Sequence, residues 1–383
     1  MKKECCSIML FGVMILFTSC AEKTVITQDN VVRVQNQMEV EREQKAQSSE
    51  SEGTFDISVW RSELPKTECA EISGKRVAIR IDADIIVPEV EEMPKKYAAQ
   101  IISLDDSKKE ALVKYLWGSK ADDVFESQSL ESSGFYQDDQ GSRLLFDKTI
   151  LFTRNTDKPF DLTCRSFSET QAENVEMNME QAKGLCEELF TEIGFTNMVL
   201  VNDSVITPID WSNNIAGGYV SEKAYYYFGY AQKIKEIPVG GWLDNQNVWN
   251  AYMGPGNRSA LMNFSIDDTG IFKIQGNLYE IRELETYEKL LSFEELLQCL
   301  ESQLSFIIMD GIKGKYGTTE EGIMTDIPIT EIKLVYLLDA DQTGQFVLEP
   351  YWQFVIGESE RDGALLTNIC IHAVTGEVGV CND

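Results

Sequence analysis

The chain has 383 residues, of which 43% are hydrophobic, and its 63 acidic and 34 basic side chains give a formal net charge of −29. A negative field of that size repels phosphates, which excludes nucleic-acid binding, and it repels anionic lipid headgroups equally. The hydrophobic fraction is typical of a globular protein with a core, and the length predicts two domains or one domain built of two units.

The N-terminus has the form of a secretory signal peptide over residues 1–19. Two lysines precede an apolar run, Ile8–Phe17, which is too short for a membrane-spanning helix of about 20 residues. Residues 17–20 read FTSC and resemble the bacterial lipobox, with Phe17 where leucine is usual. The resemblance implies that Cys20 is acylated with a fatty acid such as palmitate, which anchors the protein at the extracytoplasmic face of the cell membrane. The alternative is an ordinary cleaved signal followed by a chance cysteine.

Residues 20–53 are rich in Gln, Glu and Ser and poor in large apolar side chains. Such a composition buries too little surface to offset the entropy lost on ordering. The segment is therefore predicted to be a disordered tether.

The first predicted strand, residues 76–87, alternates apolar and polar side chains with a period of two. Asp82 and Asp84 then lie on its outward face beside Arg80, where a solvated row explains them better than a metal site. Helices are predicted over 104–117 and 179–193, and a single strand over 144–153 between them. The second helix has an unbroken apolar stripe that includes Cys186, which favours a buried side chain over a nucleophile.

Further strands are predicted over 197–206, 223–234 and 259–276, the last containing a hairpin turn at residues 267–270. A helix begins at Ser292, and Glu295 three residues later predicts a capping box. Strands follow at 331–340, 345–357 and 365–381. The order of one helix and several antiparallel strands, closed by a Thr-Gly hairpin, occurs over 180–274 and again over 292–380, which indicates a duplicated unit.

The second unit contains the patterns KLVY at 333–336, PYWQF at 350–354 and IHAVTGEV at 371–378. They resemble the pattern of PepSY-like domains and of the related YycH, YycI and YpeB regulatory proteins of Gram-positive bacteria, with His372 in place of the usual aspartate. The lipobox, tether and two units together resemble an uncharacterised lipoprotein family of Clostridia. The resemblance implies an extracytoplasmic interaction domain, a regulator of a membrane kinase or of wall turnover, and carries over no catalytic residue.

The predicted fold is α+β, with antiparallel sheets that are each packed by a helix. Its predicted parts are a signal peptide (1–19), a tether (20–53), an N-terminal α+β region (54–175) and two helix-plus-sheet units (176–285 and 286–383).

Candidate sites are few. Asp339 and Asp341 begin like a calcium loop, but Pro350 stands where a bidentate glutamate is required, so a turn between strands explains them better. His372 is the single histidine; its strand phase predicts a surface or interface position, and its isolation argues against zinc sites of the histidine type. No cofactor is predicted.

The stretch 240–257 places Trp242, Trp249 and Tyr252 among loop-forming residues. Exposed rings there would suit a glycan or peptide partner, whereas the alternative is that they cover the end of a sheet as core. A two-residue turn in the last hairpin would place Cys370 opposite Cys381, within disulfide range; free thiols are the alternative.

The sequence thus predicts a membrane-anchored, non-enzymatic lipoprotein that binds an unidentified extracytoplasmic protein. The alternative is a solute- or glycan-binding lipoprotein that uses the aromatic loop at 240–257.

Overall fold

The computed structural model describes residues 55–382, except 74–76, 128–134, 147–148, 155–164, 169–174, 211–218, 221–223, 244–259, 312–324, 342 and 358–366. The predicted signal peptide and tether lie outside the described residues. The described residues belong to one compact unit, Thr54–Asp383. They contain no helix that combines the length and apolar character needed to cross a membrane.

Five strands of the first sheet form a ring, because their pairings return to the strand at which they begin. β16 pairs with β17, β17 with β18, β18 with β19, β19 with β12, and β12 with β16 again. The strands are β12 (Ile237–Leu243), β16 (Thr325–Ala340), β17 (Phe346–Ile356), β18 (Thr367–His372) and β19 (Val378–Asn382). The β12–β16 pair is parallel, and the other four pairs are antiparallel.

Four more strands extend this sheet on both sides of the ring: β1 (Thr67–Ser73), β2 (Val77–Ile86), β3 (Lys95–Ile101) and β15 (Tyr279–Thr286). β2 runs parallel to the first half of β16 and pairs on its other side with β1. β3 joins the start of β17 to β15. Ile79 and Ile81 of β2 are buried, whereas Arg80, Asp82 and Asp84 are exposed, which confirms the predicted outward face.

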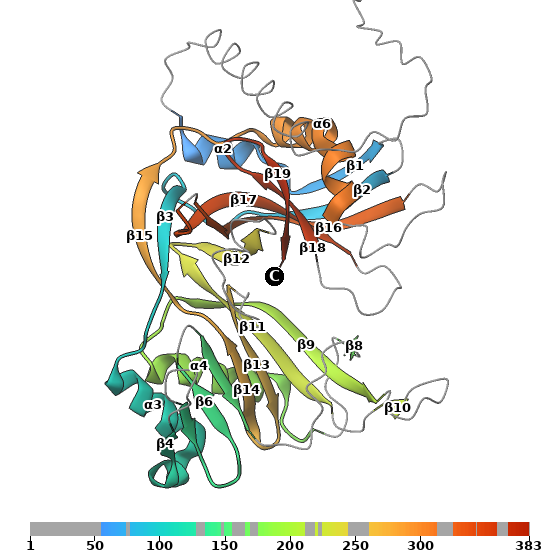
Figure 1. The fold of residues 1–383 in the computed structure, drawn as a ribbon. Coiled ribbons are helices and arrows are strands. Elements are labelled where there is room, and N and C mark those ends of the chain that lie inside the picture. The colour runs from blue at the N-terminus through green and yellow to red at the C-terminus, as the bar shows by residue number, and fades with distance from the viewer. Residues whose placement is uncertain are drawn as a thin grey trace, which may run out of the picture. The chain divides into compact units, whose positions relative to one another are not determined.

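Two helices pack against the first sheet at Trp352, which is fully buried. Trp60 of α2 (Ile57–Glu63) lies 6.0 Å from the Trp352 ring, and Phe293 of α6 (Phe293–Gly311) lies 6.1 Å from it, centroid to centroid. Figure 1 shows both helices above β17. At the start of α6, Ser292 N donates to Glu295 Oε2 (2.8 Å) and Glu295 N donates to Ser292 Oγ (3.3 Å). The predicted capping box is confirmed.

The second sheet is antiparallel throughout, in the order β8, β9, β11, β13, β14, β7, β6, β5, β4. The short strand β10 (Tyr219–Val220) pairs antiparallel with the end of β9. The strands of this sheet are β4 (Phe125–Ser127), β5 (Phe135–Gln137), β6 (Arg143–Leu145), β7 (Ile150–Thr153), β8 (Arg165–Ser168), β9 (Met198–Asp210), β11 (Tyr225–Ile234), β13 (Leu261–Asp267) and β14 (Gly270–Gly276).

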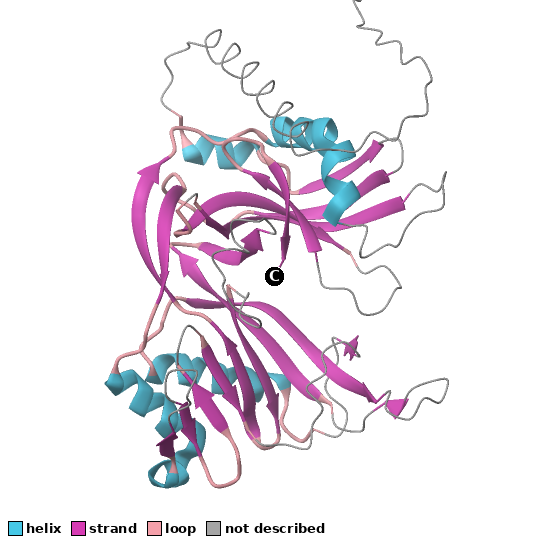
Figure 2. Cartoon of the chain, viewed as in Figure 1, coloured by secondary structure: helices cyan, strands magenta, loops and turns pink. Residues whose placement is uncertain are grey.

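One face of the second sheet is covered by α3 (Asp106–Trp117) and α4 (Met179–Glu192), and Figure 2 shows both helices in cyan beside the strands. Their apolar side chains meet those of alternate strand positions in a second core, which includes Leu112, Leu189, Phe228 and Phe264. A short 3-10 helix, η1 (Gly118–Asp123), follows α3. Both predicted helices are confirmed, and Cys186 is fully buried as expected.

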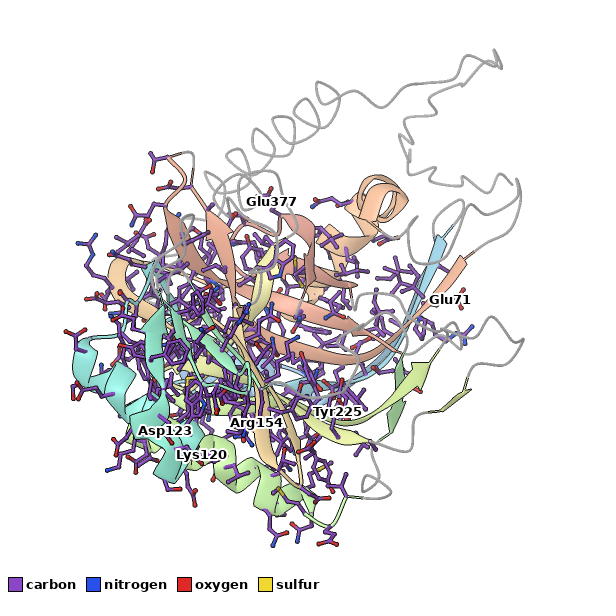
Figure 3. All side chains as sticks on the ribbon, turned by 60° about the horizontal axis from the view of Figure 1, so that its bottom comes forward. Glu71, Lys120, Asp123, Arg154, Tyr225 and Glu377 are labelled. Atoms are coloured by element: carbon purple, nitrogen blue, oxygen red, sulfur yellow. The ribbon has the colours of Figure 1, made fainter. Side chains whose placement is uncertain are left out.

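Arg154, labelled in Figure 3, connects α3 to the turn between β13 and β14 through hydrogen bonds. Its guanidinium donates through Nη1 to the Thr269 carbonyl (2.5 Å) and through Nη2 to the Leu116 carbonyl (3.1 Å). Burial lowers the pKa of Arg154, although the charges of Asp267 and Asp138 oppose that shift. Arg154 therefore holds the C-terminal end of α3 against the β13–β14 turn.

The predicted α+β class is confirmed, with a helix on each sheet. The prediction of one strand over 144–153 is wrong: β6 and β7 are two antiparallel strands in which Arg143 pairs with Thr153. The parallel pairings of β16 were not predicted, because its two neighbours come from distant parts of the chain. The predicted region 54–175 contributes α2 and β1–β3 to the first sheet, and α3 and β4–β8 to the second.

Candidate functional site

A buried cluster of polar and aromatic side chains lies where β3, β17 and the end of β18 meet. Its members are Lys96, Tyr287, Glu349, Tyr351 and His372, which we call the Glu349 cluster. The register brings it together, since Tyr351 pairs with His372 and the start of β17 pairs with β3. The side chains of Glu349 and His372 are only 13% and 5% exposed.

Both carboxylate oxygens of Glu349 have partners. Lys96 Nζ forms an ion pair with Oε1, and His372 Nε2 lies 3.2 Å from Oε2. Burial by itself would raise the pKa of Glu349, but the hydrogen bonds from His372 and Lys96, together with the charge of Lys96, prevail and lower that pKa to about 2. The carboxylate is therefore ionised at neutral pH.

The hydrogen bonds of the imidazole define its tautomer. Nδ1 of His372 accepts from the backbone N–H groups of Val374 and Thr375, both at 3.1 Å. Because Nδ1 accepts two hydrogen bonds, the ring proton lies on Nε2 and is donated to Glu349. Both ring nitrogens are thus engaged in holding the β18–β19 turn and the carboxylate.

Two tyrosines enclose the imidazole. The Tyr351 and Tyr287 rings meet that of His372 edge-on, with centroids 4.8 and 5.9 Å away. Burial, together with the charge of Glu349, raises the pKa of Tyr287 above its ordinary value. Burial likewise raises the pKa of Tyr351, so both phenols remain protonated and neutral.

The prediction that His372 lies at the surface is wrong, because the residue is 4% exposed. The strand ends at His372, and the turn that follows folds back onto its ring, because Val374 N and Thr375 N both donate to Nδ1. Sequence reasoning did not identify Lys96 or Glu349. The single histidine was the only signal pointing to the cluster.

Trp242 is 6% exposed and belongs to the first core. Its strand β12 places it beside Leu338 and Asn382, so the hypothesis of an exposed ligand-binding ring is wrong for this residue, and its core alternative is correct. Trp249 and Tyr252 lie outside the described residues, as does Cys20.

Asp341 organises a turn between β16 and β17. Its Oδ1 accepts from Thr343 N (2.8 Å), Thr343 Oγ1 (2.6 Å) and Gln345 N (2.9 Å), and these bonds, led by that from the Thr343 hydroxyl, lower the pKa of Asp341. Asp339 accepts from Ala340 N. Within the described part of the chain, no three His, Cys, Asp or Glu residues gather as metal ligands.

The predicted opposition of Cys370 and Cys381 is wrong. Cys370 pairs with Gly379 and Cys381 with Asn368, because the turn contains four residues, 373–376, rather than two. Both sulfurs are free thiols and fully buried, and Gln353 Nε2 donates to the Cys381 thiol (3.7 Å).

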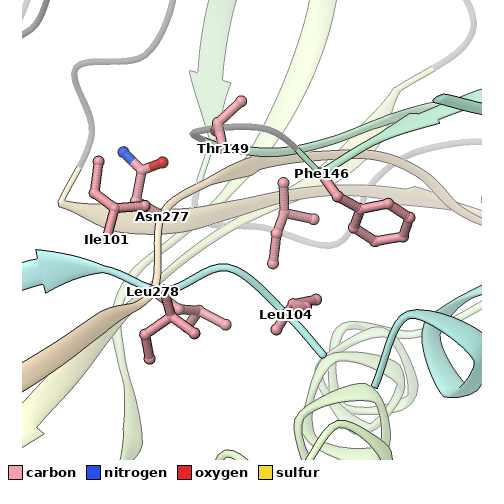
Figure 4. Close-up of a pocket in the computed structure, with 8 residues that line it drawn as sticks. Ile101, Leu104, Phe146, Thr149, Asn277 and Leu278 are labelled. Carbon is pink, nitrogen blue, oxygen red and sulfur yellow. The ribbon is translucent and has the colours of Figure 1, made fainter. Parts of the chain in front are cut away.

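A small cavity lies beside the link between β14 and β15 (Figure 4). Its volume of about 10 Å³ has room for roughly one water molecule, so it is too small for a substrate. The lining residues are Ile101, Ile102, Leu104, Phe146, Thr149, Ile150, Asn277 and Leu278.

No protein-family model matches the chain, and no curated protein matches it by sequence. Among solved structures, the chain is similar to a crystal structure of an uncharacterised protein from Eubacterium rectale, with 17% identity and a TM-score of 0.52 over 85% of this chain and 99% of that one. This similarity concerns the fold alone. The C-terminal domain of YpeB from Bacillus megaterium also matches, at 8% identity and a TM-score of 0.32 over 74% of this chain and 100% of that one, which is too low to support an argument.

Proposed function

We propose that the chain is a lipid-anchored extracytoplasmic protein that acts without catalysis, as an interaction module for another extracytoplasmic protein. The anchoring part rests on the apolar run at 8–17 and the FTSC sequence that ends at Cys20. The first described helix begins at Ile57, which leaves 36 residues between the proposed acylated cysteine and the folded body.

The Glu349 cluster carries the non-enzymatic part of the proposal. His372 is the single histidine of the chain, and a histidine that acts as a general base must offer a free ring nitrogen to its substrate. Nδ1 is occupied by two backbone donors, and Nε2 by Glu349. A proton transfer at His372 would therefore require the β18–β19 turn or the Glu349 contact to open.

The finer proposal is that the partner is a membrane kinase or a protein of wall turnover. It rests on the sequence patterns at 333–336, 350–354 and 371–378, which lie in the adjacent strands β16 and β17 and in the β18–β19 hairpin. Ala373 N donates to the Pro350 carbonyl (2.9 Å), so the second and third patterns also contact each other through the backbone.

Metabolic labelling with an alkyne fatty acid in a Gram-positive host tests the anchoring. The full chain is expected to take up the label and to sediment with membranes, whereas Cys20→Ser loses the label. Label that persists in Cys20→Ser would contradict acylation at this residue.

Photo-crosslinking tests the interaction. β15 pairs on one side with β3, and Arg282 and Glu283 on it are exposed, so a photoreactive residue at either position would report a protein partner there. Position Glu180 on α4 is the matched exposed control. A discrete crosslinked product that forms from β15 but not from Glu180 supports a defined protein partner. Identical products from β15 and from Glu180 would argue against a defined partner.

A further inference from the structure

The helix α2 is attached to the first sheet by few contacts. Of its seven residues, Trp60 alone is buried. The Trp60 indole donates through Nε1 to the Leu291 carbonyl (3.0 Å), and within the described part of the chain this is the one hydrogen bond that joins α2 to a distant segment. Three partly buried side chains complete the packing: Phe55, Ile57 and Leu64. The position of α2 on the sheet therefore depends mainly on one side chain.

The other hydrogen bonds of α2 lie within the helix and its N-cap. Asp56 Oδ1 accepts from Ser58 N (2.8 Å) and from Ser58 Oγ (2.6 Å), and Ser62 Oγ donates to the Val59 carbonyl (2.7 Å). These bonds stabilise the helix but do not attach it to the sheet. A helix of seven residues is too short to persist by itself in water, so α2 unfolds when it leaves the sheet.

The attachment to the sheet begins abruptly at Pro65, which has no N–H to donate. Before it, Leu64 N forms the last hydrogen bond of the helix (3.4 Å). After it, the Lys66 carbonyl accepts from Ile85 N (2.9 Å), and all seven residues of β1 pair with β2. Residues 55–64 can thus separate from the sheet without the loss of any strand pairing.

The surface beneath α2 is held by contacts that do not involve the helix. Leu291, which supplies the acceptor for Trp60, donates its own N–H to the Ala373 carbonyl (2.9 Å). Trp352 lies in β17, which is paired on both edges, and its ring also contacts Phe293 of α6. These contacts keep the surface in place whether or not α2 is docked.

One buried polar group beside α2 lacks a hydrogen bond. Trp352 is fully buried, and its Nε1 has no acceptor among the described residues. A buried donor without an acceptor costs free energy, which contact with water would remove. Departure of the Trp60 ring, whose centroid lies 6.0 Å from that of Trp352, opens one side of this indole. The net gain from docking α2 is therefore smaller than its apolar contacts alone would give.

We propose that residues 55–64 form a releasable latch, which undocks from the first sheet and unfolds as one unit while both sheets stay intact. Figure 1 shows α2 in blue above β17. The opening breaks one hydrogen bond to the rest of the fold and exposes one buried side chain. Opening β17 instead would break two strand pairings, so the latch opens at a much lower cost in free energy.

The latch gives the anchor proposed at Cys20 an adjustable length. This use rests on the proposed function, because tension between the membrane and a bound partner would then enter the described fold at Phe55. The ten residues 55–64, at up to about 3.5 Å each, add roughly 35 Å of reach when released. The folded body would follow its partner over that distance without the loss of either sheet.

Hydrogen–deuterium exchange of the full chain, purified in detergent and read by mass spectrometry, tests the latch. We expect peptides that cover α2 to exchange at least about 100-fold faster than peptides of β17, but more slowly than an unstructured peptide. Low urea concentrations should leave the α2 rate unchanged, because a local opening exposes little surface, and should accelerate exchange in β17.

Trp60→Ala should bring the exchange of α2 to the rate of an unstructured peptide, while β17 stays protected by about 100-fold or more. The matched control is Val59→Ala in the same helix: Val59 is 49% exposed, so its truncation should not accelerate exchange. Trp60→Phe keeps an aromatic ring but removes the N–H that binds Leu291. It should give an intermediate rate, and it provides a second variant if Trp60→Ala does not fold.

Three results would overturn the proposal. The first is exchange of α2 in step with β17, with both rates rising together in urea, because α2 would then open only with the whole fold. The second is unprotected α2 in the parent chain, which leaves the latch no closed state. The third is equal acceleration by Val59→Ala and the Trp60 variants. Exchange of the purified chain does not depend on acylation, so failure of the anchor at Cys20 and failure of the latch are separate outcomes.

Discussion

Gly240 lies so close to Val335 that a Cβ atom at position 240 would stand 2.9 Å from both Cβ and Cγ1 of Val335. The contact joins β12 to β16, the parallel pair that closes the five-stranded ring, at a register shift between Val239 and Gly241. Glycine at this position lets the two backbones approach.

Replacing Gly240 with alanine should therefore strain the ring closure. We expect Gly240→Ala to lower the free energy of unfolding by about 1–3 kcal/mol, the usual cost of overpacking. Gly184 in α4 is the matched control, because a Cβ there meets nothing within 4 Å, and Gly184→Ala should stabilise by up to about 1 kcal/mol. Chemical denaturation of both variants checks the pair; destabilisation of equal size in both would refute the steric argument.

The ion pair in the Glu349 cluster should be costly to break from one side. Lys96→Met leaves a largely buried carboxylate without its cation, and we expect a loss of about 2–4 kcal/mol, somewhat below the range for fully buried pairs. Lys95→Met is the neighbouring control: its Nζ pairs with Glu283 at 2.7 Å, but Glu283 is 53% exposed, so the loss should stay below about 1 kcal/mol. Urea denaturation of both variants measures the two losses in unfolding free energy. Losses of similar size would argue that the Lys96–Glu349 ion pair contributes no more than the exposed Lys95–Glu283 pair.

Acid should remove the contribution of Glu349. Its pKa lies at about 2 in the folded protein, below the unfolded value of about 4.3. A carboxyl group whose pKa is lower in the folded than in the unfolded protein stabilises the fold at pH values above the unfolded pKa. This stabilisation is lost as the pH falls towards the folded pKa. The difference in unfolding free energy between the parent chain and Glu349→Gln should shrink as the pH falls from about 4.3 to 2. A difference that does not change with pH would assign the effect to packing alone.

His372 should act through its hydrogen bonds. His372→Leu removes the acceptor for Val374 N and Thr375 N as well as the donor to Glu349, and should cost about 2–4 kcal/mol. His372→Asn retains a side-chain acceptor for the turn and should cost less. Thermal unfolding of the two variants gives the order, and a more stable leucine variant would contradict the assigned role.

Thiol labelling separates the described cysteines by burial. Cys69 is exposed, although a hydrogen bond to Asp82 raises its pKa and slows the reaction. Cys186, Cys370 and Cys381 are buried thiols and should react with iodoacetamide only after unfolding. Peptide mass spectrometry without reduction locates the label, and a linked Cys370–Cys381 peptide would contradict the four-residue turn.

Local features of the fold were predictable from sequence because their signals lie within one turn or one strand. The capping box of Ser292 and Glu295, the outward aspartates of β2 and the buried Cys186 each depend on residues a few positions apart. The register of the last hairpin was not predictable, because a Thr-Gly pair fits both a two-residue and a four-residue turn.

The Glu349 cluster could not have been found in the same way. Lys96 and Glu349 are 253 positions apart, and only the pairing of β3 with β17 brings them together. With 63 acidic residues in the chain, no local pattern distinguishes Glu349 from the others. The burial of His372 was missed for a related reason: strand alternation predicts the face, but not the turn that covers it.

The ring of five strands also limits the order in which the protein can fold. β12 lies near the middle of the chain, yet its partners are Leu337 and Leu338 on one side and Cys381 and Asn382 on the other. While the ribosome or an export channel still holds the last residues, β19 cannot yet pair with β12. The apolar Trp242 and Leu243 then lack their final packing. Contacts of such long sequence separation form slowly, so ring closure should be a late, post-translational step during which this part of the chain depends on protection from aggregation.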